Sequence, residues 1–309
     1  MDTKISDLAA LIGTSAQSLE KCIARIDHSY SLRQIEGSTH LQFLRFDGNG
    51  EPMVKALAEV MYTHIIDYCL ASRDRCQTLT LQEAAKLTKM ARKLFVHPEA
   101  TPADPDQTGE AGELLLYLLI EAVLNAPQVV AKMELKTNPN LEVNGSDGIH
   151  MAWNANESLV EIYFGEAKVY QDMGAAIKAA LASIDGFHAK DICRHEMLMV
   201  TKHFKHAAPA VKSVVGSLIL DGVPTSGVRI NHACLIGFNW NEYKAIFSQP
   251  TSARLDALKS AYLNAAAKIH STCDEKLEAF ASKHLRLTFF FIPFKNVQDF
   301  RTAFNEALD

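Results

Sequence analysis

Residues 145–168 read GSDGIHMAWNANESLVEIYFGEAK, and the alternation of apolar side chains within them decides the fold. Apolar residues recur at every second position on both sides of the polar link 154–158, which is the pattern of two strands that each bury one face. A short polar link between two such strands favours an antiparallel hairpin. We therefore predict that residues near 147 lie opposite residues near 166.

The ionisable residues of this hairpin lie at its open end. Asp147 precedes the first strand, while Glu166 and Lys168 are two residues apart and share one face of the second. Carboxylates hold Mg²⁺ through a few direct bonds and leave positions for water and a substrate phosphate. A lysine beside them orients that water or stabilises charge on the phosphoryl group. The pattern predicts metal-dependent phosphodiester hydrolysis, although Glu-x-Lys alone is also a common surface pair at a strand edge.

A helix is predicted over residues 109–124, because this segment is apolar on nearly every side. Glu110 and Glu113 lie three residues apart at its amino-terminal end, where the helix dipole favours negative charge. One interpretation is capping of the first turn. The other is a functional site, because a carboxylate in so apolar a helix needs an opening, a partner or a cation. Glu113 is the stronger candidate for a site residue, and Glu110 is the weaker.

The order of a helix glutamate, a strand with Asp147 and a strand with Glu-x-Lys resembles the PD-(D/E)xK nuclease superfamily. Three stretches resemble more narrowly the HamA nuclease subunit family of the Hachiman anti-phage defence system. They are GEAGELLLYLL at 109–119, KMELKTNPNLEVNGSDGIH at 132–150 and LVEIYFGEAKVY at 159–170. The superfamily pattern alone is weakly specific, whereas the combination is much stronger.

This resemblance implies a mixed sheet flanked by helices and a DNA nuclease that uses Mg²⁺ or Mn²⁺ together with a HamB-like, ATP-dependent helicase. Carried over by position, Asp147, Glu166 and Glu113 would ligate the metal, and Lys168 would be the catalytic lysine. Gln171 resembles the downstream glutamine of RecB-like members, with loose agreement in spacing. The proline that often precedes the aspartate in this superfamily is absent, and Ser146 stands before Asp147.

The domain organisation predicted from the sequence has three parts. Residues 1–96 form a helical region, 97–108 form a Pro/Asp-rich linker, and 109–309 form the nuclease-like domain. Periodic apolar residues predict helices over 51–70 and 80–95 in the first part and over 297–308 at the end. Continuous apolar runs at 232–238 and 285–292 predict buried strands that extend the sheet.

A second motif lies at the start of the chain. Residues 7–23 have the spacing of a helix-turn-helix, with Ala9, a glycine turn at Gly13 and apolar Leu19 and Ile23. The segment YSLRQIEGSTHLQFLRF at 30–46 then predicts a hairpin resembling a wing. The second helix offers little positive charge for a DNA backbone, so a packing or protein-contact module is favoured over DNA reading.

Composition bounds the class of protein. The 309 residues are 48% hydrophobic, which is enough to bury a sizeable core. No membrane span and no signal-peptide pattern are recognisable, so a cytoplasmic location without membrane association is expected. The six cysteines are dispersed without CxxC spacing, which argues against a zinc ribbon or a disulfide framework.

The formal charge of −5 disfavours DNA binding through overall charge, because affinity for DNA comes chiefly from neutralising phosphates. Basic residues do outnumber acidic ones between Lys178 and Lys212, and this stretch is a candidate DNA path. Delivery of the substrate by a partner is the other interpretation. Two further functions stay open at this point: a non-catalytic adaptor that binds a helicase or DNA, and a winged-helix regulator.

Overall fold

A computed structural model describes residues 6–14, 16–71, 79–95, 109–135, 145–189, 192–205, 213, 215–220 and 222–309. The chain divides into two compact units. The first unit comprises Met1–Thr14, Thr63–Gly165 and Gly186–Asn231. The second unit comprises Ser15–Tyr62, Glu166–Asp185 and His232–Asp309.

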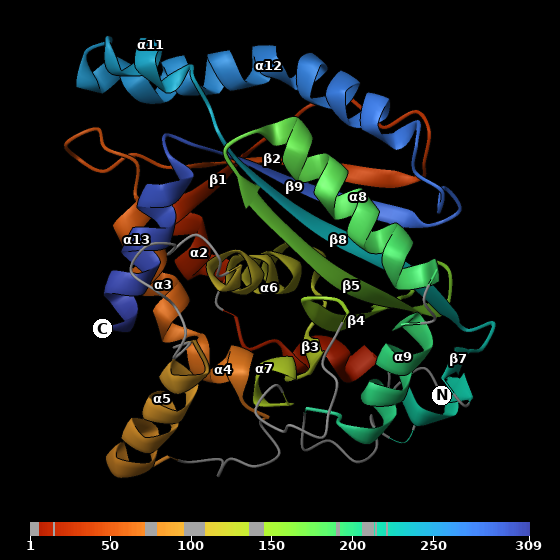
Figure 1. Ribbon diagram of the computed structural model, residues 1–309. Helices are drawn as coiled ribbons and strands as arrows, with labels where there is room; N and C mark the ends of the chain where they lie inside the picture. The colour runs from red at the N-terminus through yellow and green to blue at the C-terminus, as the bar shows by residue number, and fades with distance from the viewer. Residues whose placement is uncertain are drawn as a thin grey trace. The chain divides into compact units, whose positions relative to one another are not determined.

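The fold is mixed α/β, as the sequence predicts, and its main element is a seven-stranded sheet of order β1-β2-β9-β8-β5-β4-β3 (Figure 1). Parallel pairing joins β2 to β9, whereas β1–β2, β3–β4 and β4–β5 are antiparallel. The strands are β1 (Ile23–Ile26), β2 (Gly37–Leu44), β3 (Gln128–Val130), β4 (Gly148–Asn154), β5 (Leu159–Tyr170), β8 (Val228–Asn239) and β9 (Arg286–Phe294). A separate small hairpin pairs β6 (Ile219–Leu220) with β7 (Val223–Pro224).

The predicted hairpin is confirmed in the first unit. Its register pairs Gly148 with Gly165 and Asn154 with Leu159, so the polar link forms the turn. The predicted apolar row of β5, from Val160 to Phe164, is fully buried in a core shared with β3, β4 and α9. Burial of this row fixes the register, because a slip of one residue would turn every apolar side chain to the opposite face.

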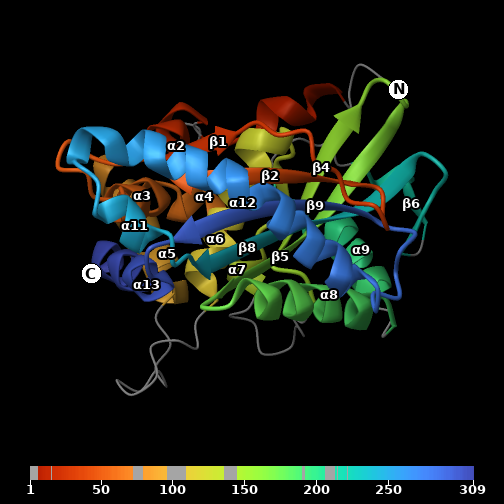
Figure 2. The ribbon, with the colours of Figure 1, turned by 90° about the horizontal axis from the view of Figure 1, so that it is seen from above.

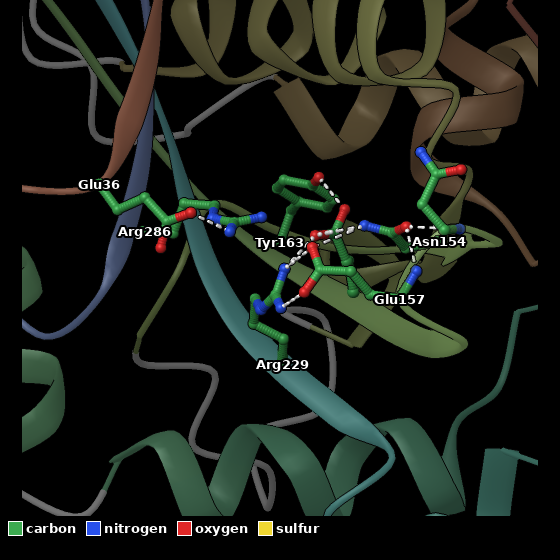
Figure 3. A network of polar contacts seen from close by, with 8 residues as sticks. Glu36, Asn154, Glu157, Tyr163, Arg229 and Arg286 are labelled. Carbon is green, nitrogen blue, oxygen red and sulfur yellow. Dashed lines mark hydrogen bonds and ion pairs between the residues drawn. The ribbon is translucent and has the colours of Figure 1, made fainter.

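An arginine clamps the turn of this hairpin to β8 (Figure 3). The guanidinium of Arg229 forms ion pairs with Glu157 in the turn and with Glu161 in β5, the latter at 3.2 Å. Tyr163 donates to the other oxygen of Glu161 at 2.6 Å, and Asn154 caps the turn by accepting from the N–H of Glu157 at 3.1 Å. The ion pairs of Arg229 therefore stabilise the closed end of the hairpin, whereas Asp147, Glu166 and Lys168 lie at its open end.

The predicted core helix is α6 (Glu110–Leu124), and it packs against β4. Every residue from Leu114 to Glu121 is buried, so the helix is enclosed on all sides as expected. It ends where Asn125 takes a left-handed conformation with φ 52°. The other helices of this unit are η1 (Ser6–Leu11), α4 (Ile65–Cys69), α5 (Leu81–Phe95), α7 (Lys132–Leu135) and α9 (Ile192–Lys202).

The second unit is built around β9, whose residues Leu287–Phe294 are all buried. Such a continuous apolar run suits an inner strand covered on both faces. Helix α12 runs along β9, and the hydroxyl of Tyr262 donates to the carbonyl of Phe291 at 2.9 Å (Figures 1 and 2). The other helices are α2 (Ala16–Cys22), α3 (Val54–Thr63), α8 (Met173–Ala189), α11 (Tyr243–Phe247), η4 (Thr251–Ala253), α12 (Arg254–Leu277) and α13 (Val297–Leu308).

The wing predicted at 30–46 is wrong. Ile23, expected in a second helix, begins β1 directly after the seven-residue α2, and β1 pairs with β2. The opposite edge of β2 pairs with β9. Burial explains the difference, because Ile23 and Ile26 both pack into the core when β1 pairs with β2. The region predicted as helical therefore contains two strands.

Other predictions of elements fare as follows. The strands at 232–238 and 285–292 and the helices at 80–95 and 297–308 are confirmed as β8, β9, α5 and α13. The single helix predicted over 51–70 is two helices, α3 and α4, because the backbone leaves helical geometry at His64 with ψ 3°. The predicted linker 97–108 lies outside the described residues.

Among the helices described, none has the length and apolar character required to cross a membrane.

Candidate active site

Glu166 and Lys168 lie in β5 and form an ion pair, with Nζ of Lys168 2.5 Å from Oε1 of Glu166. The contact is the one expected of residues two apart on a strand, whose side chains share a face. The pair lies just beyond the end of the β4–β5 ladder, whose last pair is Gly148 with Gly165. The Glu166 side chain is only 10% exposed and that of Lys168 only 22%. Both charges are thus largely removed from water and oriented by each other.

Asp147 lies one residue before β4, at the open end of the hairpin. Its backbone N–H donates to the carbonyl of Gly165 at 2.8 Å, which extends the ladder by one step beyond the pair Gly148–Gly165. Glu166 is the next residue of β5 after Gly165. The hairpin therefore places the main chain of Asp147 beside the residue that precedes Glu166, as the sequence predicts.

Glu113, in the first turn of α6, accepts a hydrogen bond from the hydroxyl of Tyr68 at 3.2 Å. Tyr68 lies in α4 and is fully buried. Burial raises the pKa of its phenol well above the usual value, and the negative charges of Glu113 and Asp147 raise it further. Two of the predicted carboxylates thus act on the same buried phenol, which stays protonated and serves as a donor.

Carboxylate oxygens are the ligands that suit Mg²⁺. Within the part of the chain that the structure describes, no three histidine, cysteine, aspartate or glutamate side chains are arranged to hold a metal ion. Mg²⁺ in nucleic-acid enzymes is commonly held by one or two carboxylates, with water and substrate phosphate completing the octahedron. Asp147 and Glu113, both in the first unit, carry oxygen atoms of the type that Mg²⁺ prefers.

A comparison with protein families gives one match over nearly the whole chain. The model of the HamA family matches residues 20–308. The chain belongs to the HamA family. This membership associates it with Hachiman anti-phage defence. A comparison with proteins of curated function finds no similar sequence.

The remaining candidates of this HamA family member differ in their surroundings. Glu110, the weaker of the two helix candidates, is the more buried one, at 6% exposure. The N-cap of α6 is Gly109 without a side-chain bond. Gln171 lies beyond the end of β5 and is exposed, while its carbonyl accepts from the N–H of Asn239 at 3.2 Å. The structure does not bring the Gln171 side chain into the buried surroundings of Glu166.

The basic stretch predicted between Lys178 and Lys212 is only partly a surface. Lys178, Arg194 and Lys202 are exposed, but Lys205 is 2% exposed. Its Nζ donates to Gln128 at 2.7 Å and to the carbonyl of Asp67. Lys205 is therefore a structural residue that cannot contact DNA, and the expectation is wrong at this position. Lys190 and Lys212 lie outside the described residues.

Several polar residues around the site escape sequence reasoning. Tyr68 comes from a helix that precedes α6 by some forty positions, so only the fold brings it to Glu113. Lys132 and Glu196 form a buried ion pair in the first unit, with Nζ 2.8 Å from Oε2. Glu121 is buried in the last turn of α6, and a carboxylate inside an apolar helix is a signal that could have found it.

Proposed function

We propose that this HamA family member is a Mg²⁺-dependent nuclease that hydrolyses phosphodiester bonds in DNA, with a site of the PD-(D/E)xK type. The observation that carries the proposal is the end of the β4–β5 ladder. There the N–H of Asp147 is bonded to Gly165, and the chain continues to Glu166 and its ion-paired Lys168. Two carboxylates and an ammonium are the groups that metal-assisted attack on a phosphodiester needs.

Each residue has a distinct role in this proposal. Asp147 and Glu166 would hold Mg²⁺, with Glu113 as a further ligand, and Mn²⁺ would be accepted in its place. When bound, Mg²⁺ supplies a Lewis acid for the phosphoryl oxygen and a lowered pKa for the attacking water. Lys168 donates to that water or to the phosphoryl oxygen, where negative charge develops. The water oxygen would form the new P–O bond as one ester P–O bond breaks, and the proton that the water loses would end on the departing oxygen.

Glu166 also has a role before substrate binds. Because its carboxylate is paired with Lys168 at 2.5 Å, the ammonium is already held on the metal-binding face of β5. A donor that is oriented in advance stabilises a transition state without reorganisation during the reaction. In the same way, the hydrogen bond from the hydroxyl of Tyr68 would orient the carboxylate of Glu113 before the metal binds.

A partner is part of the proposal. The formal charge of −5 gives the chain little affinity for DNA through overall charge. We propose that an ATP-dependent, HamB-like helicase delivers the DNA strand, in keeping with the association of the HamA family with Hachiman defence. The exposed Arg194 and Lys202 of α9 would then contribute only a small part of the phosphate contacts.

The test is cleavage of plasmid and linear DNA with Mg²⁺ and ATP, by the chain alone and with the helicase encoded beside it. The double variant Glu166→Ala/Lys168→Ala should be folded and should not cleave. The matched control is Glu275→Ala/Lys276→Ala, which removes an ion pair of the same residue types from exposed positions on α12. Activity in the control and none in the site variant supports the proposal, and equal activity of all three proteins refutes it.

The Glu166–Lys168 ion pair also suits a second function, that of a non-catalytic adaptor that binds a helicase or DNA. In that case the pair is purely structural, and its loss lowers the free energy of unfolding. Removal of crowded metal-binding carboxylates instead leaves stability unchanged or raises it. Denaturant unfolding of Glu166→Gln in EDTA separates the two functions: a loss of stability together with absence of cleavage by the wild type favours the adaptor.

A further inference from the structure

The segment that carries Asp147 is attached to a buried ion pair outside the proposed site. Lys132 of α7 and Glu196 of α9 have side chains that are 4% and 1% exposed. The ammonium of Lys132 donates to both carboxylate oxygens, at 3.0 Å and 2.8 Å. The proposed chemistry uses neither charge, yet both have been moved out of water.

Ser146, the residue before Asp147, is bound to both partners of this pair. Its carbonyl accepts from Nζ of Lys132, and its hydroxyl donates to Oε2 of Glu196 at 2.9 Å. Ser146 is itself only 6% exposed. One residue therefore uses its main chain for the cation and its side chain for the anion, which fixes both its position and its rotation.

Gly145 brings the backbone against the same carboxylate. A Cβ at this position would lie 2.8 Å from Oε1 of Glu196 and 3.0 Å from Cγ2 of Ile192. The residue also has a φ of 131°, which a side chain disfavours. The close approach therefore requires glycine, so the turn before Asp147 is shaped to fit the ion pair.

Asp147 is held from its other side by the hairpin, through the hydrogen bond from its N–H to Gly165 at 2.8 Å. Its side chain is half-buried. The ion pair and the β4–β5 ladder thus anchor successive residues, and Asp147 has little freedom between them.

Stability is a poor explanation for this arrangement. Removing two charges from water costs more than a single pair often returns, and replacement by well-packed apolar residues is frequently neutral or stabilising. A buried pair that contacts the residue next to a proposed metal ligand has a different use, because groups that orient metal ligands commonly change metal affinity by about 10–100-fold.

We propose that Lys132, Glu196 and Ser146 are positioning residues that hold Asp147 in the orientation needed to bind the divalent metal. The inference rests on the proposed function, since it takes Asp147 as a metal ligand. It assigns to the GSD sequence a role for each residue: Gly145 permits the approach, Ser146 binds the ion pair, and Asp147 faces the site.

The first test compares Ser146→Ala with wild type. This change removes only the 2.9 Å hydrogen bond to Glu196. The control is Thr201→Ala on α9, which removes a hydroxyl bonded to the carbonyl of Leu198 at 2.8 Å and touches neither partner of the ion pair. Mn²⁺ affinity, measured by electron paramagnetic resonance on the full chain without DNA, should fall about 10-fold in Ser146→Ala and stay unchanged in Thr201→Ala.

The second measurement does not depend on metal or activity. Hydrogen exchange of the Asp147 amide should be about 10-fold faster in Ser146→Ala and in the double variant Lys132→Met/Glu196→Leu, with global stability retained or raised in the double variant. Unchanged exchange together with unchanged Mn²⁺ affinity would overturn the inference. If the wild type neither binds Mn²⁺ nor cleaves DNA, the proposed function fails, and the exchange result alone decides whether the ion pair positions Asp147.

Discussion

Substitution by glutamine should have different effects at two glutamates of α6: it should lower the stability of the protein at Glu121 and impair DNA cleavage at Glu113. Glu121 is 1% exposed, and its carboxylate accepts three backbone N–H groups. Oε2 accepts from Gly13 at 3.1 Å and Thr14 at 3.0 Å, and Oε1 accepts from Gln128 at 3.0 Å. Glu113 is half-buried and accepts from Tyr68.

The magnitudes follow from these contacts. The bonds to Thr14 and Gln128 are buried, and each buried donor that loses its acceptor costs about 1–3 kcal/mol, so Glu121→Ala should lower the free energy of unfolding by about 2–6 kcal/mol. Glu121→Gln keeps one acceptor oxygen and should cost about 1–3 kcal/mol. Glu113→Gln keeps an acceptor for Tyr68 and should change stability by less than about 0.5 kcal/mol.

The assay is urea unfolding at 25 °C and pH 7, followed by circular dichroism, with DNA cleavage measured on the same preparations. Glu113→Gln should be as stable as wild type and strongly impaired in cleavage, whereas Glu121→Gln should be destabilised. If both variants lose equal stability, or if Glu113→Gln alone is destabilised, the division of α6 into a structural and a functional carboxylate is refuted.

Three further outcomes are expected. Tyr68→Phe removes the donor to Glu113 and should cost about 0.5–1.5 kcal/mol of stability while raising the Mg²⁺ concentration needed for half-maximal cleavage; an unchanged Mg²⁺ requirement would contradict a positioning role. Phe164→Ala empties a fully buried position and should cost about 3–5 kcal/mol in urea unfolding, and a loss under 1 kcal/mol would argue against the predicted core. Burial is the main cause that lowers the pKa of His150 from 6.5 to about 3, so the unfolded chain binds a proton at a higher pH than the folded chain, and stability should fall as the pH drops from about 6.5 towards 3. His150→Gln should flatten this pH dependence of the urea unfolding midpoint, and an unaltered slope would show that His150 does not cause it.

The sequence by itself determined the helices and strands whose apolar and polar side chains follow a regular local pattern. Alternation around the link 154–158 gave β4, β5 and their register, and the all-round apolar segment gave α6. The last helix was predicted at its observed bounds, Val297–Leu308, where the side chain of Asn296 caps the N–H of Gln298 at 3.0 Å. In each case the deciding information lies within a few residues, since periodicity and capping are local properties.

In the candidate site, too, local sequence patterns identify some residues, and only the fold identifies the others. Asp147, Glu166 and Lys168 could be named from the sequence, because a two-residue spacing and a hairpin register place them without knowledge of the rest of the fold. Tyr68 could not be named, since no local pattern links α4 to the first turn of α6. Glu196 is one of the acidic residues within the stretch 178–212 that was a candidate DNA path, whereas the fold pairs it with Lys132 in the interior.

Only the tertiary structure decided which distant segments meet. Residues 37–41 pair with 287–291 in the parallel β2–β9 ladder, which replaced the local hairpin expected there. Lys205 is buried rather than part of the predicted basic surface, because the carbonyl of Asp67 and the side-chain amide oxygen of Gln128 accept hydrogen bonds from its ammonium. Such choices depend on competition among all the surfaces that the chain can bury, and a buried charge survives only where the fold supplies its partners. That information is not contained in any single stretch of the sequence.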